Sequence, residues 1–241
     1  MRQAATCYER KLAVAVCSMS AASEARDKIF GQHYWILNVR HKVTAIRDLK
    51  SLLSDIVPFI KDPRFLYRGR EVPNFRQRPR EILANWLICT AGNCEDGPDA
   101  WTFCLDPMGG DGVIVKRSTG VGWPTEHVFI PAPKAMPVES IEDLIVDAVA
   151  HKRQKGEAYA RGKQLVVFAD VKGGPWRPNQ AGKRIEGQHS FESVWAVGLE
   201  QADGNEYLYW VVRFEELNSH VWKISVDIET IEWSVERIQQ L

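Results

Sequence analysis

The sequence predicts an α/β fold, and three observations support this prediction. Apolar residues recur at helical spacing in segments that begin near residues 43, 79 and 140. The run LVVFAD, residues 165–170, is continuously apolar, which is typical of a buried central strand. Near the C-terminus, the segments VWAVGL, YLYWVVRF, VWKISV and IEWSVE are rich in β-branched and aromatic residues. From residue 79 we expect a helix, three strands, a helix, a strand and a β-rich end.

The first helix is expected over residues 43–57, and Pro58 should end or kink it. Its apolar face consists of Ile46, Leu49, Leu52, Leu53 and Ile56. Residues 61–80 then carry seven Lys or Arg against two acids, with Pro and Gly interruptions, and resemble a basic connector. The sequence therefore divides into an N-terminal helical region with a basic connector, residues 1–78, and an α/β core with a β-rich end, residues 79–241.

The core is expected to begin with a helix at Pro79, because proline is favoured at the first helical position. Gly92 is a plausible end for this helix. Its apolar stripe consists of Ile82, Leu83, Trp86 and Leu87. A strand, WTFCL, follows at residues 101–105, and residues 113–130 should form a hairpin that turns near Thr119 and Gly120.

A second core helix is expected after Ser140, which forms a capping-box pattern with Asp143. One face of that helix carries Ile141, Leu144, Ile145, Ala148 and Val149. In the β-rich end, residues 203–205 (Asp-Gly-Asn) indicate a turn. Alternation in the last two segments places one apolar set on a single face, namely Trp222, Ile224, Val226, Ile231, Trp233 and Val235.

Composition narrows the class of protein. The 241 residues carry no formal net charge, which argues against obligate non-specific DNA binding but leaves room for local basic patches. The five cysteines are irregularly spaced, so neither a disulfide framework nor a structural zinc site is expected. The N-terminal apolar run is short and Glu9 interrupts its approach, and no run reaches the roughly 20 residues of a membrane span. We expect a cytoplasmic protein with reduced thiols and no membrane partner.

The strongest chemical signal lies in residues 109–131, where each strand of the expected hairpin begins or ends near an acid. With a turn near Gly120, Asp111 and Glu126 fall at the same end of two paired strands, about 5 Å apart if on one face. Two carboxylates at that spacing suit a hard cation such as Mg²⁺ or Mn²⁺, which retains waters for a phosphate ligand. The alternative to a metal ligand is an ordinary turn residue for Asp111 and a solvated carboxylate at a strand end for Glu126.

With these two acids and this element order, residues 79–170 resemble the PD-(D/E)XK nuclease superfamily. The resemblance implies a restriction-endonuclease-like mixed sheet flanked by helices, here with a β-rich C-terminal extension. It also implies that Asp111 and Glu126 hold the metal and that Glu81, on the first helix, assists. A literal Pro98-Asp99 also occurs, but the glycine-flanked Asp111 fits better against Glu126.

The sequence departs from the family at one position, because Val128 stands where the pattern has a lysine. His127 is no simple substitute for it, since adjacent strand residues point to opposite faces, although a role as ligand or base stays open. Some members of the superfamily supply the lysine from the following helix. Lys152 suits that role because it continues the apolar stripe of the helix toward the sheet, with Lys163 as second choice. A snorkelling surface lysine is the alternative for Lys152.

The sequence-based hypothesis is therefore a nuclease-like protein that hydrolyses phosphodiester bonds in DNA with a divalent metal. The basic connector could follow a phosphate backbone through Arg64, Arg68, Arg70, Arg76, Arg78 and Arg80. The alternative is a catalytically silent protein of the same fold, serving as a DNA-binding or assembly subunit of a DNA-processing or defence complex. Protein partners could bind the β-rich end. Neither oligomeric state nor sequence specificity follows from the sequence.

Overall fold

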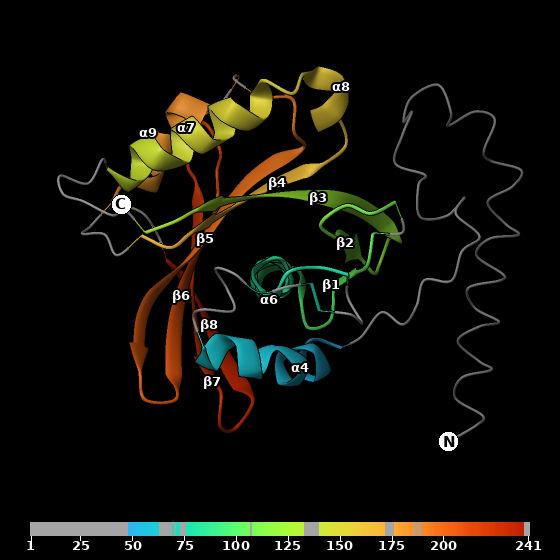
Figure 1. Ribbon diagram of the computed structural model, residues 1–241, viewed down its shortest axis with the longest axis vertical. Coiled ribbons are helices and arrows are strands. Elements are labelled where there is room, and N and C mark those ends of the chain that lie inside the picture. The colour runs from blue at the N-terminus through green and yellow to red at the C-terminus, as the bar shows by residue number, and fades with distance from the viewer. Residues whose placement is uncertain are drawn as a thin grey trace, which may run out of the picture.

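The computed structural model describes residues 48–62, 69, 71–72, 76–106, 108–132, 140–171, 176–185, 187 and 189–238. This part of the chain is α/β, as the sequence predicts. It forms a mixed eight-stranded sheet with helices on both faces (Figure 1). The predictions for residues 1–42, and for Arg64, Arg68 and Arg70 of the basic connector, concern residues outside these ranges.

The strands follow one another across the sheet in the order of the chain, from β1 to β8. Strands β1, β2 and β3 are antiparallel neighbours, β3, β4 and β5 run parallel, and β5 to β8 are antiparallel again. Their bounds are β1 Trp101–Cys104, β2 Val113–Lys116, β3 Val121–Ile130, β4 Gln164–Ala169, β5 Ser193–Asp203, β6 Glu206–Arg213, β7 His220–Asp227 and β8 Glu232–Ile238.

Helices cover the two faces of the sheet separately. Helices α4 (Leu49–Lys61) and α6 (Pro79–Asp96) lie on one face, and α7 (Ile141–Arg153) and α9 (Pro178–Ile185) lie on the other (Figure 1). The short helix α8 (Glu157–Ala160) follows α7. The helices of both parallel crossovers, α7 between β3 and β4 and α9 between β4 and β5, therefore lie on the same face of the sheet. Alternate residues of β4 belong to the cores on its two faces.

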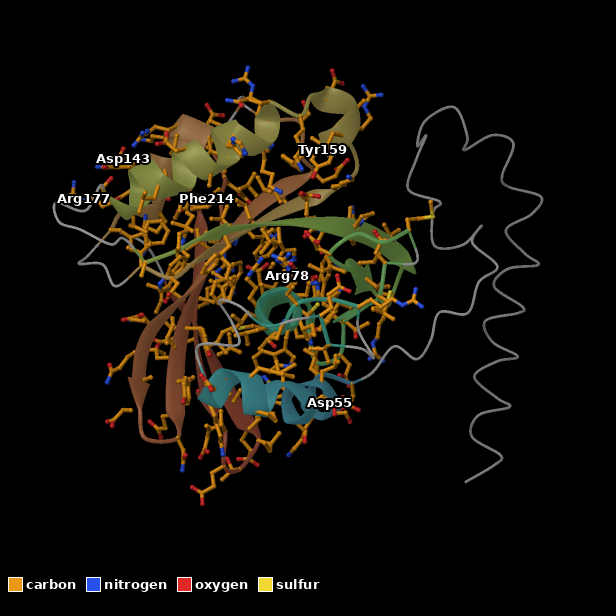
Figure 2. All side chains as sticks on the ribbon, in the orientation of Figure 1. Asp55, Arg78, Asp143, Tyr159, Arg177 and Phe214 are labelled. Atoms are coloured by element: carbon orange, nitrogen blue, oxygen red, sulfur yellow. The ribbon has the colours of Figure 1, made fainter. Side chains whose placement is uncertain are left out.

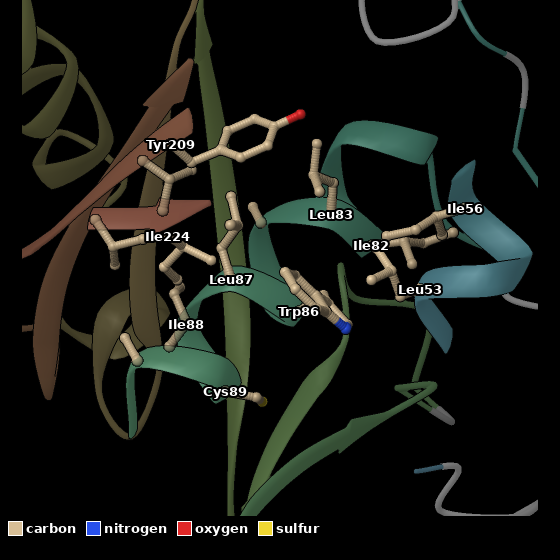
Figure 3. Close-up of a cluster of buried hydrophobic side chains, with 14 of the residues drawn as sticks. Leu53, Ile56, Ile82, Leu83, Trp86, Leu87, Ile88, Cys89, Tyr209 and Ile224 are labelled. Carbon is tan, nitrogen blue, oxygen red and sulfur yellow. The ribbon is translucent and has the colours of Figure 1, made fainter. Parts of the chain in front are cut away.

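The core on the α6 face is built from aromatic and branched side chains of α4, α6 and the sheet (Figure 3). Trp86 is fully buried and its indole N–H donates to the carbonyl of Leu49 at 2.8 Å, which fixes α4 against α6. Trp86 also meets Trp233 of β8 edge to face, with ring centroids 5.3 Å apart. Helix α4 thus shares one core with the sheet. The division at residue 79 stays a prediction.

Most of the expected elements are confirmed. Strand β4 is buried at every residue, as its continuous apolar sequence predicts. Ser140 caps α7, since its hydroxyl accepts from the backbone N–H of Asp143 at 3.1 Å. A turn joins β5 to β6 at residues 204–205, and Gly204 there has φ +57°. The alternating apolar set from Trp222 to Val235 faces the α6 core, as its spacing predicts.

The predicted helix end at Gly92 is wrong, and so is the alternative that Pro58 ends the first helix. Helix α4 begins at Leu49 with Asp48 as its N-cap, and the predicted residues 43–47 lie outside the described ranges. Helix α4 continues through Pro58 to Lys61. The carbonyl that loses its hydrogen-bond donor there belongs to Ser54, which is exposed and can bond water instead. Helix α6 passes Gly92 and ends at Asp96. Gly92 has a packing role, since a Cβ at this residue would lie 2.8 Å from the indole of Trp101. Helix α9 was not expected, because its buried residues are mostly small.

Candidate active site

The hairpin of β2 and β3 brings Asp111 opposite Glu126. Val113 pairs with Pro124, and the backbone N–H of Thr125 donates to the carbonyl of Gly112 at 2.8 Å, so the next residues outward are Asp111 and Glu126. The turn occupies residues 117–120, where the sequence predicts it, and Gly120 supplies the positive φ of +67°. The two acids therefore lie at the same end of paired strands.

Asp111 is held by two hydrogen bonds from different elements. Its Oδ2 accepts from the backbone N–H of His127 at 2.7 Å, which continues the pairing of the hairpin through a side chain. Its carbonyl accepts from Nδ2 of Asn85, on α6, at 3.0 Å. Burial raises the pKa of Asp111; the bond from His127 opposes this effect, and the charge of Glu126 adds to it. The negative charge of Glu126 thus disfavours ionisation of Asp111, and the positive charges of Lys152 and Arg78 oppose this effect.

Glu126 faces the other helix layer and meets the end of α7. Its Oε1 accepts a hydrogen bond from Nζ of Lys152 and lies 3.6 Å from Nζ of Lys155. The hydroxyl of Tyr159, on α8, also bonds its carboxylate. Burial would raise the pKa of Glu126, but these bonds and the two ammonium charges outweigh it, and the pKa is lowered. Glu126 is therefore ionised and already has a cationic partner.

The position of Lys152 follows from the sequence of α7. Ile145 and Val149 are buried against the sheet, and Lys152 comes one turn after Val149 on the same side of the helix. Its side chain is only 12% exposed, so it turns inward rather than reaching into solvent. Lys163, the second choice, instead places its ammonium 4.0 Å from the centre of the Tyr159 ring.

His127 lies on the opposite face of β3 from Glu126, as strand alternation predicts. It pairs with Val166 of the α6 core, whereas Glu126 pairs with Leu165 of the α7 core. Its Nε2 lies 3.1 Å from Oδ1 of Asn85, and burial lowers its pKa to about 3, so the ring is neutral. Asn85 therefore connects the ring of His127 to the backbone of Asp111.

Glu81 lies near Asp111 but is engaged at the start of α6. Its Oε2 accepts from the backbone N–H of Arg78 at 2.8 Å, which is the glutamate half of a capping box, and Arg80 lies 3.8 Å from its Oε1. Burial raises the pKa of Glu81; the bond from Arg78 opposes this effect, and the negative charge of Asp111 adds to it. Glu81 is therefore close enough to Asp111 to sense its charge.

The three described arginines of the basic connector differ in exposure. Arg76 is exposed and has φ +48°, and the side chain of Arg78 is 54% exposed. Arg80 is only 12% exposed, and its guanidinium lies 5.0 Å from the centre of the Phe129 ring. Arg80 thus faces the protein interior, while Arg76 and Arg78 face solvent.

A buried polar layer beneath Asp111 was missed by sequence reasoning. Asn85 is fully buried, and Gln77 is 1% exposed with no partner for its amide among the described residues. Both amides crowd Gly112, where a Cβ would lie 2.6 Å from Nδ2 of Asn85. Gly112 has φ +127°, so it also requires glycine for its backbone. The available signal was Asn85 itself, a polar residue within the apolar stripe of α6.

The donor set fits a hard divalent cation in type. The carboxylates of Asp111, two residues before β2, and of Glu126, on β3, are oxygen donors of the kind such a cation prefers, and Oδ1 of Asp111 is not used in its bond to His127. Within the described ranges, no group of three or more His, Cys, Asp or Glu side chains lies together as a metal site. A cation at this pair would therefore take its remaining ligands from water, backbone or substrate.

The chain matches no protein-family model and none of the curated proteins it was compared with. No helix in the described part of the chain combines the length and the apolar character that crossing a membrane requires. The functional argument therefore rests on the geometry of the Asp111–Glu126–Lys152 cluster.

Proposed function

We propose that this protein is a divalent-metal-dependent nuclease-like phosphodiesterase that acts on DNA. The observation that supports the proposal best is the contact between Lys152 and Glu126, across the hairpin end from Asp111. Two carboxylates and an ammonium group are the residue types that phosphodiester hydrolysis needs. The family pattern takes its lysine from β3, and here α7 supplies one despite Val128.

The order of elements gives the proposal a second line of support. From Pro79 the chain follows the expected order of helix, three strands, helix and strand, with α8 inserted before β4. The mixed sheet with helices on both faces is compatible with a restriction-endonuclease-like core. Strands β5 to β8 then form the β-rich extension.

In this mechanism Asp111 and Glu126 would hold Mg²⁺ or Mn²⁺ through their carboxylate oxygens. When bound, the ion supplies an acidified water and stabilises negative charge at the phosphate. Lys152 compensates Glu126 and presents its ammonium group to the developing charge of the scissile phosphate. Glu81 assists by fixing the start of α6 beside Asp111. Arg76 and Arg78 contact the DNA backbone outside the site, as Arg64, Arg68 and Arg70 would along the connector.

A cleavage assay tests the proposal directly. Purified protein is incubated with supercoiled, linear and single-stranded DNA, and with RNA, in Mg²⁺, Mn²⁺ or EDTA. We expect metal-dependent cleavage of DNA that Asp111→Asn and Glu126→Gln each reduce by at least about 100-fold. Asp99→Asn is the matched control, because Asp99 is an exposed turn acid with φ +58°. Equal cleavage by wild type, Asp111→Asn and Glu126→Gln would refute the nuclease assignment.

The second candidate is a catalytically silent protein of this fold that binds DNA or assembles with other proteins. The specific observation in its favour is that Glu126 is already bonded to Lys152 and Tyr159, with Lys155 nearby, in addition to the valine at position 128. Strand β8 is an edge of the sheet and could pair with a partner strand. DNA binding in EDTA without cleavage in any metal would select this candidate.

A further inference from the structure

The segment from the end of α7 to the start of β4 carries a cluster of cationic side chains beside the candidate active site. Lys163 directly precedes Gln164, which pairs with Thr125, so the segment ends where β3 presents Glu126. Residues 151–163 contain five Lys or Arg and one acid. The acid, Glu157, pairs with Arg161, the residue that caps the C-terminal end of α8. The segment therefore adds positive charge to the side of the site that α8 covers.

Two of these lysines are organised by one tyrosine. Lys155 lies 4.4 Å from the centre of the Tyr159 ring and donates to its hydroxyl at 2.9 Å. Lys163 lies 4.0 Å from the same ring centre. Ammonium groups near an aromatic ring gain cation–π attraction, which offsets part of their mutual repulsion. We call Lys155, Tyr159 and Lys163 the lysine–tyrosine surface.

The charge of this surface is only partly neutralised within the described part of the chain. Lys163 forms no ion pair with any described residue, and Lys155 shares Glu126 with the closer Lys152. The side chain of Lys155 is 47% exposed. The segment lies at the C-terminal end of α7, where Figure 2 labels Tyr159. Lys163 has no carboxylate partner among the described residues, and Lys155 has only a share of Glu126, so these two fixed ammonium groups suit an anionic partner.

We propose that the lysine–tyrosine surface binds the phosphate backbone of the DNA strand that enters the candidate active site, without reading its bases. The ring of Tyr159 is engaged by two ammonium groups, so its role is to position them rather than to stack on a base. A lysine ammonium group binds phosphate as a point charge, and a contact to phosphate does not distinguish one base from another. The inference rests on the proposed function, because it takes DNA as the substrate.

Binding measured without metal tests this surface separately from cleavage. Fluorescence anisotropy follows a short fluorescein-labelled DNA duplex of mixed sequence in EDTA, at salt concentrations from about 50 to 200 mM. A plot of the logarithm of the association constant against the logarithm of salt concentration has a negative slope. We expect Lys155→Ala/Lys163→Ala to make this slope less steep by about 1.8, since each of two lost phosphate contacts contributes about 0.9. Binding at about 100 mM salt should weaken at least tenfold. Circular dichroism establishes that the variant is folded.

The matched control is Lys50→Ala/Lys183→Ala, which removes two exposed lysines from α4 and α9. The neighbour of Lys183, Arg184, pairs with Asp143 at the opposite end of α7 from Tyr159 (Figure 2). This control should leave the slope near the wild-type value. Tyr159→Ala should weaken binding more than Tyr159→Phe, because phenylalanine keeps the ring that faces both ammonium groups.

The outcomes separate the two proposals. Equal slopes for Lys155→Ala/Lys163→Ala and its control would overturn the lysine–tyrosine surface, even if the wild type cleaves DNA. Loss of binding that depends on the base sequence of the duplex would overturn phosphate recognition. A wild type that binds DNA through these lysines but cleaves nothing in any metal would support this surface and refute the nuclease. A wild type that binds no DNA in EDTA would overturn the surface.

Discussion

Replacing Lys152 by methionine should destabilise the fold through the charge it leaves on Glu126. Methionine keeps the length and the apolar stem of lysine but removes the ammonium group. The lost interaction is a hydrogen bond between two charged groups whose side chains are 12% and 17% exposed. Such bonds contribute about 1.5–3 kcal/mol, and breaking a fully buried pair costs about 3–5 kcal/mol.

The expected cost lies at the lower end of these ranges. After the substitution, Glu126 still has the ammonium group of Lys155 at 3.6 Å and the hydrogen bond from Tyr159. We therefore expect a loss of about 1.5–2 kcal/mol at neutral pH. For a chain of this length, that loss corresponds to a decrease in Tm of about 3–8 °C. Differential scanning calorimetry of the wild type and Lys152→Met measures this difference.

The pH dependence gives the reasoning a sharper test. The folded-state pKa of Glu126 is lowered below its ordinary value of 4.5, so its contribution to stability is present above that value and is lost as the pH falls through the folded-state pKa. The Tm difference between wild type and Lys152→Met should therefore be full at neutral pH and shrink in acid. Adding Glu126→Gln to the variant should recover most of the loss, because no buried charge remains.

Two results would refute this reasoning. A Tm for Lys152→Met within the error of the exposed control Lys183→Met would mean that the ammonium group does not compensate Glu126. A Tm difference that stays constant from neutral pH to below the folded-state pKa of Glu126 would mean that the loss comes from packing rather than charge.

Two further predictions concern the α6 face. Gly112→Ala should lower the free energy of unfolding by about 2–4 kcal/mol, because it combines φ +127° with a Cβ only 2.6 Å from the Asn85 amide. Gly120→Ala is the control, since Gly120 has φ +67° but open space around it, and should cost about 1–2 kcal/mol. Equal losses in urea unfolding would argue against crowding at Gly112. Trp86→Phe should cost about 2–4 kcal/mol, because it leaves a cavity and removes the donor to the carbonyl of Leu49. A loss below about 1 kcal/mol in the same assay would show that this hydrogen bond does not anchor α4.

The predictable part of the fold depends on local signals that tertiary contacts reinforce. Ser140 fixes the start of α7 through its own side chain, and the apolar run of β4 can be satisfied only between two covered faces. The turn before Gly120 sets the register of the hairpin, so the pairing of Asp111 with Glu126 follows from counting residues. The inward direction of Lys152 follows from the helical repeat of α7.

The part of the site that the sequence did not reveal depends on contacts between distant elements. Tyr159 reaches Glu126 from a four-residue helix, which is too short to produce a periodic pattern. Asn85 links Asp111 to His127 across 26 and 42 positions, and nothing local to α6 indicates those partners. The catalytic roles of Asp111, Glu126, Glu81 and Lys152, and the metal itself, stay predictions for the cleavage assay.

The strictly sequential order of strands has a consequence for how the chain folds. Each strand pairs with the strand before it, so the sheet can grow along the chain without inserting a later strand between earlier ones. The α6 core does not share this locality, because Trp86 packs against Trp233 of the last strand. During synthesis, the apolar side of α6 therefore cannot be fully buried before β7 and β8 have been made. Until they emerge from the ribosome, that side of the nascent chain stays exposed and is prone to aggregation.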